Sequence, residues 1–470
     1  MISSEVDTES TPLLQSQEAH KHEEVYKRFT PRQKRFILGT VSITGLLPLF
    51  ISGTFIPSIP QIAKDLDSTA PIVSLAVSLS IIAASLGALW GSSYSTFYGR
   101  RPVYLVGTPL LVIGSIGVAT AQSIPPLMFW RFIQAMGASP GFAVGSGVIG
   151  DIYKLEERGR AMGIFFSAVL LGPAIAPFIG GYAAHYFSWR LLQFSLGVFG
   201  FCAFVLILFF FPETYHPGKR GVDKADPATL PTWRPILINP FTPLWMMRSP
   251  NLLFVTMAGF ACLFTDYVLL VPLAYTIGKK YGITNEALIG ACFLPCGLGN
   301  MIGAPLAGRL SDTIVVKYRK ERGGAWYPED RLRATIPGAL FLIPLSVLGS
   351  GLLTEYVPGK VGLALNLCCL FMNGVGVDFV LSPASAYFVD LMHSRSAEAM
   401  AAGMGFRNVI MALCIAGVLP MIENYGVVVT DTLSAVAAWV FGFGLLWVTI
   451  RYGERLRAVV DVGFSTADNN

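Results

Sequence analysis

Long apolar segments separated by short polar ones follow one another along the chain from residue 36 onward. A helix needs about 20 mostly apolar residues to cross a bilayer. Six such runs precede a polar stretch at 212–250, and they lie at 36–57, 71–92, 103–121, 126–149, 161–184 and 190–211. Six more follow it, at 251–275, 286–308, 334–353, 361–385, 399–420 and 432–450. The pattern predicts an all-α membrane protein with twelve transmembrane helices in two halves of six.

The polar segments set the expected organisation of the chain. Residues 1–35 are rich in Ser, Thr, Glu and Lys, and we expect a disordered tail there, without a cleavable signal peptide. The N-terminal half is predicted at 36–211 and the C-terminal half at 251–450. The proline-rich, charged segment 212–250 is expected to link them. Residues 451–470 form the predicted C-terminal tail.

Composition agrees with a membrane protein. Of the 470 residues, 53% are hydrophobic and 13% are charged. Soluble domains contain about 25% charged residues, so a soluble protein of this size would lack the charges needed to cover its surface. The same composition excludes a disordered chain, a coiled coil and a protein that binds nucleic acid, despite the net charge of +5.

Basic residues are distributed unevenly between the two sides of the predicted membrane. If both termini are cytosolic, the cytosolic segments carry 27 Lys and Arg, and the opposite segments carry 5. Cytosolic loops of membrane proteins are enriched in Lys and Arg, and adding or removing one span would invert the distribution. The charges therefore predict that both termini are cytosolic.

The sequence lacks signatures of enzymes and of metal sites. The seven cysteines lie inside apolar runs, without disulfide or zinc spacing, and the five histidines lie outside those runs. No Gly-Lys-Ser or Gly-Lys-Thr tripeptide marks a phosphate-binding loop. We expect no metal, no cofactor and no enzymatic activity.

Four ionisable residues lie inside the predicted spans: Arg131, Asp266, Asp378 and Arg407. Such residues are costly in a bilayer and mark functional sites by default. Arg131 precedes Gln134 by one helical turn, and its alternative roles are a structural ion pair or snorkelling from the outer end of its helix. Both aspartates are candidates to carry protons. Asp266 lies deeper and is preferred, while a structural role is equally open for Asp378.

Small residues and prolines form regular patterns in several spans. Gly137 belongs to a set of glycines repeated every four residues, a spacing that lets helices pack closely or slide past each other, and both uses remain open. In the span at 161–184, two prolines lie one turn apart beside glycines, and each proline removes a backbone donor and kinks a helix. This span is therefore expected to bend or to seal a cavity. The residues concerned are Gly172, Pro173, Pro177, Gly180 and Gly181.

A weak internal repeat relates the two halves. The loop after the second span contains Gly99, Arg100 and Arg101, and the loop after the eighth span runs from Gly308 to Asp312. Duplicated six-helix halves with a substrate site between them are a known transporter architecture. The repeat thus favours a transporter.

Several of these segments resemble motifs of the major facilitator superfamily. Trp130–Ala138 is similar to the motif of its fourth span, and Gly172–Gly181 to the antiporter motif of its fifth. Pro212-Glu213-Thr214 is typical of fungal members, and Leu294-Pro295 with the glycines that follow resembles the quinidine-resistance branch. Over roughly 36–452, the chain resembles fungal twelve-span drug:proton antiporters.

The resemblance implies roles for individual residues. Proton coupling would involve Arg131, Asp266 and Asp378. The substrate cavity between the halves would include Gln134, Asn300, Asn373 and Arg407. Residues expected to act in the conformational change are Gly99, Arg100, Arg101, Gly137, Gly172, Pro173, Pro177, Gly180, Gly181, Gly308 and Asp312. In the first loop, Thr96 and Phe97 replace an Asp and an Arg of the family motif, so its charge latch is expected to be weakened or rebuilt.

These features favour a proton-coupled efflux transporter that exports drugs, toxic compounds or secondary metabolites by alternating access. Two buried arginines beside two buried aspartates keep open an exporter of organic acids, for instance a dicarboxylate such as itaconate. A nutrient-sensing receptor with a transporter fold is the alternative from another class, although such receptors carry long cytosolic tails and the tail predicted at 451–470 is short. The expected partners are a small-molecule substrate, protons and the lipid bilayer, and the protein is expected to be monomeric.

The N-terminal tail contains a segment that resembles an acidic dileucine sorting signal, formed by Glu9, Leu13 and Leu14. So short a pattern also recurs by chance. We expect the plasma membrane as the location, and the signal keeps the vacuolar membrane open.

Overall fold

The computed structural model describes residues 26, 28–153, 155–216, 218, 220–224, 239–325, 327–391 and 396–459. Over these residues the chain is helical and contains no strand. Twelve helical segments of this described part are long and apolar enough to cross a membrane, which confirms the predicted class and number of spans. The sorting motif predicted at Glu9, Leu13 and Leu14 lies outside the described residues.

The elements follow one another in the order expected for two halves. The first half contains α2 (Pro31–Phe55), η1 (Ile56–Ser58), α3 (Ile59–Asp65), α4 (Ala70–Tyr98), α5 (Arg100–Thr120), α6 (Ile124–Ala138), α7 (Pro140–Ile152), α8 (Leu155–Tyr186) and α9 (Trp189–Phe210). Two short elements follow, α10 (Gly221–Lys224) and η2 (Thr242–Arg248). The second half contains α11 (Pro250–Leu270), η3 (Ala274–Gly278), α12 (Glu286–Ala291), α13 (Leu294–Glu321), α14 (Glu329–Leu332), η4 (Arg333–Thr335), η5 (Gly338–Leu342), α15 (Ile343–Tyr356), α16 (Gly359–Leu391), α17 (Ser396–Tyr425), α18 (Val427–Ala437), η7 (Ala438–Phe443) and α19 (Gly444–Val459).

Local sequence sets where the helices begin and end. Thr30 caps α2, because its hydroxyl accepts the Gln33 N–H while the Gln33 side chain accepts the Thr30 N–H at 2.9 Å. Asn285 caps α12 by accepting two backbone N–H groups of the first turn. The turn from α4 into α5 requires Gly99, whose φ is 107°. Polar residues and glycine therefore end the helices where the apolar runs stop.

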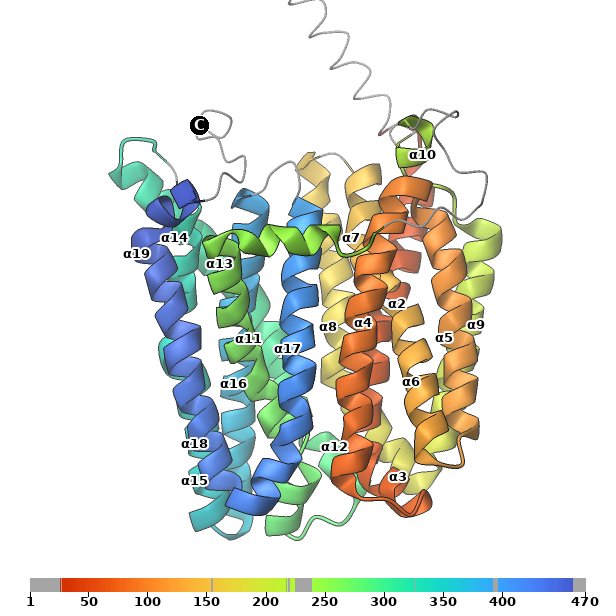
Figure 1. Cartoon of the computed structure of the whole chain (residues 1–470), viewed down its shortest axis with the longest axis vertical. Helices are drawn as coiled ribbons and strands as arrows, with labels where there is room; N and C mark the ends of the chain where they lie inside the picture. Colours follow the sequence, from red (N-terminus) through yellow and green to blue (C-terminus); the bar gives the residue numbers. More distant parts are fainter. Residues whose placement is uncertain are drawn as a thin grey trace, which may run out of the picture.

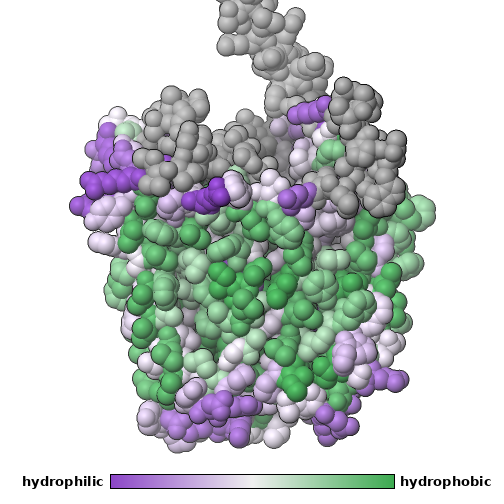
Figure 2. Space-filling view, viewed as in Figure 1, coloured by the Kyte–Doolittle hydropathy of each residue, from purple (hydrophilic) through white to green (hydrophobic). Residues whose placement is uncertain are grey.

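The spans form two bundles that stand side by side, one built from α2 to α9 and the other from α11 to α19 (Figure 1). α10 and the end of α19 lie at one end of the molecule, which we call the α10 side, and α3 lies at the opposite end, the α3 side. Figure 2 shows an apolar belt between two polar rims at these ends. This surface suits a protein that crosses a bilayer.

The buried apolar residues show how the two bundles meet. Near the α10 side, one cluster lies within the first half around Tyr104 and Phe165, and another lies within the second half around Tyr387 and Phe388. Near the α3 side, a single cluster contains residues of both halves, from Phe55 to Phe293 and beyond. The halves therefore share one core on the α3 side and keep separate cores on the α10 side.

Small residues allow α8 of the first half to approach α12 and α13 of the second. A Cβ added at Gly297 of α13 would lie 2.9 Å from the Cβ of Ala174 in α8, closer than ordinary van der Waals contact. At the end of this contact, His185 Nδ1 and Glu286 Oε2 are 2.7 Å apart. Close helix packing and a polar pair thus join the halves on the α3 side.

We predict that Gly297→Ala destabilises the protein, because the added methyl group overlaps α8. Overpacking costs about 1–3 kcal/mol, so the apparent midpoint of thermal unfolding of the purified protein should fall. The control is Gly417→Ala on α17, where a Cβ has no heavy atom within 4 Å and the higher helix propensity of Ala should leave the midpoint unchanged or raise it. Equal midpoints for the two variants would contradict the close contact between α8 and α13.

Candidate functional site

Arg131 and Gln134 lie on one face of α6 and form a polar cluster with the two neighbouring helices. Arg131 Nη1 donates to Gln134 Oε1 at 2.8 Å. Gln134 Nε2 donates to Ser115 Oγ of α5 and to Gln193 Oε1 of α9, each at 2.9 Å. All four side chains are buried. The spacing of one helical turn thus lets Gln134 hold Arg131 in place and connect it to α5 and α9.

The guanidinium of Arg131 has few partners for a buried charge. Its Nε and Nη2 atoms have no hydrogen-bond partner among the described residues, and its Cζ lies 4.1 Å from the centre of the Phe55 ring. The contact with the ring offsets part of the cost of burial, but a buried charge ordinarily needs a paired acid. Arg131 is 0% exposed, so it does not snorkel to the membrane surface. Two of its donor atoms therefore remain available to a ligand or to an acid that a conformational change brings near.

Asp266 of α11 and Asp378 of α16 lie together in the second half. Cys296 Sγ donates to Asp266 Oδ1 at 3.5 Å, while Asp378 Oδ2 has no partner in the described part of the chain. The two carboxyl groups are close enough to interact electrostatically. α13 passes beside them, since a Cβ at Gly303 would lie 3.3 Å from the Cβ of Asp378. Carboxyl groups placed in this way inside a membrane protein suit proton binding.

Two asparagines and an arginine add polar atoms to the second half. Asn373 Nδ2 donates to Thr265 Oγ1 and Ser346 Oγ, each at 3.1 Å, and Asn373 Oδ1 has no partner among the residues described. Asn300 Oδ1 and Arg407 Nε also have no hydrogen-bond partner among the described residues. Buried polar groups are normally hydrogen-bonded. The unpartnered atoms of α13, α16 and α17 are therefore candidate contacts for a polar ligand.

The polar clusters of the two halves are separate in this conformation. Within the described residues, no hydrogen bond or ion pair joins Arg131 to Asp266 or Asp378. Of the predicted cavity residues, Gln134 belongs to the cluster of the first half, and Asn300, Asn373 and Arg407 belong to the second half.

A further set of polar contacts lies at the α10 side of the first half. Arg100 donates from Nε to Asp151 Oδ2 and from Nη1 to Ser95 Oγ, each at 2.9 Å. The Glu213 carboxylate accepts the backbone N–H groups of Arg100 at 2.9 Å and of Arg101 at 3.2 Å. A helix N-terminus has free N–H groups and a positive partial charge. Glu213, which follows the last span of this half in the sequence, therefore caps the N-terminus of α5.

The second half has a corresponding set. Arg331, at the start of the ninth span, donates to Asp312 Oδ1 at 2.8 Å and to Asp390 near the end of α16. Arg100 and Arg331 each lie near the start of the third span of their half, and Asp151 and Asp390 each lie near the end of the fourth. The internal repeat predicted from the loops is thus also a repeat of ion pairs.

Comparison with known proteins decides the family. The profile described as Major Facilitator Superfamily matches residues 41–419. The chain belongs to the major facilitator superfamily. It is 26% identical to the efflux pump radE of Floropilus chiversii over 434 residues, which cover 88% of this chain and 79% of radE. It is 36% identical to the MFS antiporter QDR3 of Candida albicans over 195 residues, which cover 42% of this chain and 27% of QDR3.

A solved structure shares the superfamily fold. The crystal structure of the human organic anion transporter MFSD10 (TETRAN) aligns with a TM-score of 0.57 at 16% sequence identity, covering 89% of this chain and 100% of that one. Together the comparisons confirm the predicted major facilitator superfamily, and the curated relatives that the chain resembles are fungal transporters. The chain is a multi-pass efflux transporter for small molecules rather than an enzyme.

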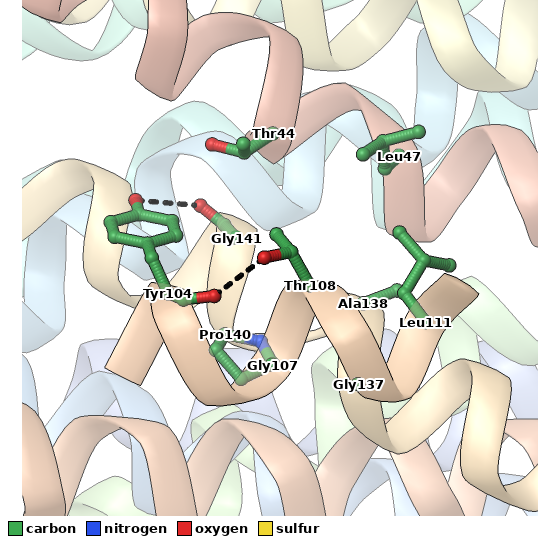
Figure 3. A pocket seen from close by; sticks show the side chains of 10 residues that line it. All are labelled: Thr44, Leu47, Tyr104, Gly107, Thr108, Leu111, Gly137, Ala138, Pro140 and Gly141. Carbon is green, nitrogen blue, oxygen red and sulfur yellow. Dashed lines mark hydrogen bonds between the residues drawn. The ribbon is translucent and has the colours of Figure 1, made fainter. Parts of the chain in front are cut away.

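In this superfamily member, Gly137 lies where α2, α5, α6 and α7 converge (Figure 3). The cavity at this point measures about 10 Å³, and a single water needs roughly 10–15 Å³. A Cβ at Gly137 would lie 2.7 Å from the Cβ of Leu110. Tyr104 Oη donates to the Gly141 carbonyl at 3.4 Å, and Thr108 Oγ1 donates to the Tyr104 carbonyl at 2.7 Å. Gly137 therefore allows close packing here, and the cavity is too small for a substrate.

The glycines of the predicted antiporter motif in α8 face two different partners. Gly172 and Gly180 face α2 of the same half, and a Cβ at Gly180 would lie 2.8 Å from the Cα of Thr54. Gly181 faces α12 of the other half, where a Cβ would lie 3.1 Å from the carbonyl carbon of Glu286. α8 continues as one helix through both of its prolines. The motif therefore connects the first half to the second.

Sequence reasoning missed several of these groups. Gln193 is a polar residue inside the predicted span 190–211, and a polar residue within an apolar run could have identified it as part of the site. Asp151 and Asp390 follow corresponding spans of the two halves, so the internal repeat could have revealed them. In the loop where Thr96 and Phe97 replace the residues of the family motif, Arg100 instead contacts Ser95, Asp151 and Glu213. No group of His, Cys, Asp and Glu in the described segments could hold a metal ion.

We predict that Glu213→Ala lowers the stability of the transporter, because α5 loses the carboxylate that accepts two of its N–H groups. The loss of a helix cap costs about 0.5–2 kcal/mol, so the apparent midpoint of thermal unfolding should decrease. The control is Glu355→Ala, which removes an exposed acid near the α3 side and should leave the midpoint unchanged. A midpoint for Glu213→Ala equal to that of the control would mean that the cap contributes nothing.

Proposed function

We propose that this transporter exports small organic compounds in exchange for protons, by alternating access of its two halves. The observation that carries the proposal is the pair of incomplete polar clusters, with Arg131 in one half and Asp266 and Asp378 in the other. An acid that binds a proton in one conformation and meets an arginine in another makes the conformational equilibrium depend on protonation. The resemblance to QDR3, which is named an MFS antiporter, supports exchange of this kind.

The packing of the halves supports a conformation closed on the α3 side. The shared apolar core and the pair of His185 with Glu286 lie on that side, whereas the cores of the α10 side are separate. The positive-inside distribution predicts that the α10 side is cytosolic. The conformation is then closed toward the exterior, and the transport cycle would open the contact between α8 and α12.

Drugs, toxic compounds or secondary metabolites are the proposed cargo. The resemblance to radE, which is named an efflux pump, supports export at this general level. The proposed location is the plasma membrane, with the vacuolar membrane as alternative, and the proposed functional unit is a monomer.

A second candidate cargo is an organic acid such as a dicarboxylate. The unpartnered donor atoms of Arg131 and Arg407 favour it, because a guanidinium binds carboxylates with charge-assisted hydrogen bonds. The acids of the second half favour a neutral or cationic cargo instead. The two candidates therefore differ in which of the unpartnered groups binds the substrate.

Counterflow in proteoliposomes would separate these functions. Vesicles containing the purified full chain would be loaded with an unlabelled drug or dicarboxylate and supplied outside with the radiolabelled compound, with and without a pH gradient. Accumulation of drugs that increases with the gradient supports the leading proposal, and accumulation of dicarboxylates alone supports the second. The absence of flux with every compound would favour the receptor alternative.

We predict that Arg131→Ala reduces efflux driven by a proton gradient by at least about tenfold, equivalent to roughly 1.4 kcal/mol. The substitution removes the only basic group of the cluster formed with Ser115, Gln134 and Gln193. Transport would be measured in proteoliposomes with an imposed pH gradient, and size-exclusion chromatography would show that the variant is folded. The control is Arg451→Ala, which removes an exposed arginine on α19. Unchanged efflux in the Arg131 variant would remove this residue from the mechanism.

We also predict that one aspartate carries the proton. Replacing this aspartate by a neutral residue should make transport independent of the pH gradient. Asp266→Asn is expected to retain counterflow but to lose the acceleration by a pH gradient, because an amide cannot exchange a proton. Asp378→Asn tests the alternative assignment in the same assay. The control is Asp67→Asn at an exposed position between α3 and α4. If both buried aspartates can be neutralised together without loss of gradient-driven efflux, neither of them couples protons.

A further inference from the structure

The short helix η2 lies across the second half on the α10 side, in front of α17 (Figure 1). Met247 anchors it: its side chain is buried in the apolar cluster of the second half, and Thr256 Oγ1 lies 3.6 Å from its sulfur. The other face of the segment carries large exposed aromatic side chains, with Phe241 49% exposed and Trp245 66% exposed. η2 is thus fixed to the bundle by one face and presents an aromatic face outward.

A cavity of about 380 Å³, largely open at the surface, lies between η2 and the two helices beneath it. Its lining includes Leu244 and Trp245 of η2, Leu253 in the first turn of α11, and Phe406 of α17. Sites for small molecules measure about 300–1,000 Å³ and are mostly apolar. The size and lining of this cavity therefore suit an apolar ligand or the apolar part of a larger one.

A single cation stands among the lining residues. Arg248 is exposed, and its Cζ lies 3.1 Å from the centre of the Trp245 ring. The stacking holds the guanidinium beside the apolar cavity, and because Arg248 is exposed, its donor atoms can meet solvent or a ligand. The site thus combines an apolar volume with one positive charge at its edge.

The position of the cavity points to a membrane lipid. Trp residues and basic residues gather where the apolar core of a bilayer meets its headgroups, and η2 lies at the boundary between the apolar belt and the polar rim of the α10 side (Figure 2). Basic residues at this level attract anionic headgroups. We propose that the cavity binds one anionic phospholipid, with an acyl chain against Leu244, Leu253 and Phe406 and the phosphate at Arg248.

Such a lipid would touch a helix of the candidate transport site. Phe406 lines the cavity, and the next residue of α17 is Arg407, whose Nε has no hydrogen-bond partner within the described chain. α17 also packs along α4 of the other half. The lipid would therefore contact a helix at which the halves meet, without itself being cargo.

The test is lipid binding by the purified full chain in detergent, measured by native mass spectrometry. Phosphatidylserine and phosphatidylcholine with identical acyl chains would be compared. We expect the first bound lipid molecule to bind about fivefold more tightly when it is phosphatidylserine, which is the gain in affinity that one basic residue gives near an anionic headgroup. Arg248→Gln should abolish this preference, and Trp245→Ala should weaken binding of both lipids. The matched controls are Arg451→Gln and Trp447→Ala, which change an exposed arginine and an exposed tryptophan on α19.

The outcomes are distinguishable from those of transport, because binding is measured without a substrate or a gradient. Loss of the preference in Arg248→Gln but not in Arg451→Gln supports the lipid site. Equal binding of the two lipids by the unchanged protein overturns it, as does an equal loss in both arginine variants. Displacement of the bound lipid by millimolar inorganic phosphate also overturns it, since Arg248 would then be a site for free anions. Arg248 is exposed, so its variant remains informative even if Trp245→Ala fails to fold.

Discussion

A polar group inside a bilayer has no water to bind and must find its partners within the protein, and this constraint organises the whole structure. Most hydroxyl groups inside the spans meet it locally, by donating to a carbonyl one turn earlier, as Thr108 and Ser115 do. Charged side chains meet it at the ends of the spans, where Arg100 pairs with Asp151 and Arg331 with Asp390. The exceptions lie deep in the two halves and define the candidate site.

Polar contacts at the α10 side connect corresponding spans in the two halves but use different residue types. In the first half, the acid Glu213 comes from the end of the sixth span and caps the third. In the second half, the arginine Arg457 comes from the end of the twelfth span and pairs with Glu329 at the start of the ninth. Both halves thus join the end of their last span to the start of their third, through a carboxylate and backbone N–H groups in the first half and through an ion pair of side chains in the second. A pairwise contact between a third and a sixth span is therefore retained even where neither residue type is.

The sequence predicts the fold well because long apolar runs and the distribution of Lys and Arg are strong, additive signals. It also locates Arg131, Asp266, Asp378 and Arg407, since an ionisable residue in an apolar run stands out. What it does not provide is the set of partners. Gln193 approaches Gln134 from 59 residues away, and Asp151 meets Arg100 across 51, contacts that depend on how helices pack. Local pattern carries no information on that packing.

The small residues of α8 determine how closely the two halves approach each other on the α3 side. Glycine at an interface lets helix backbones approach closely. The contact gains dispersion energy over a small area, without side chains that interlock. Gly181 and Gly297 make such contacts across the halves, and the partly exposed pair of His185 and Glu286 adds one polar interaction at their edge. Separation would also expose the large side chains of the shared apolar core on this side, such as Phe55 and Phe293. In the proposed exchange, protonation would therefore have to favour the separated conformation by enough free energy to offset the loss of this core and of the polar pair.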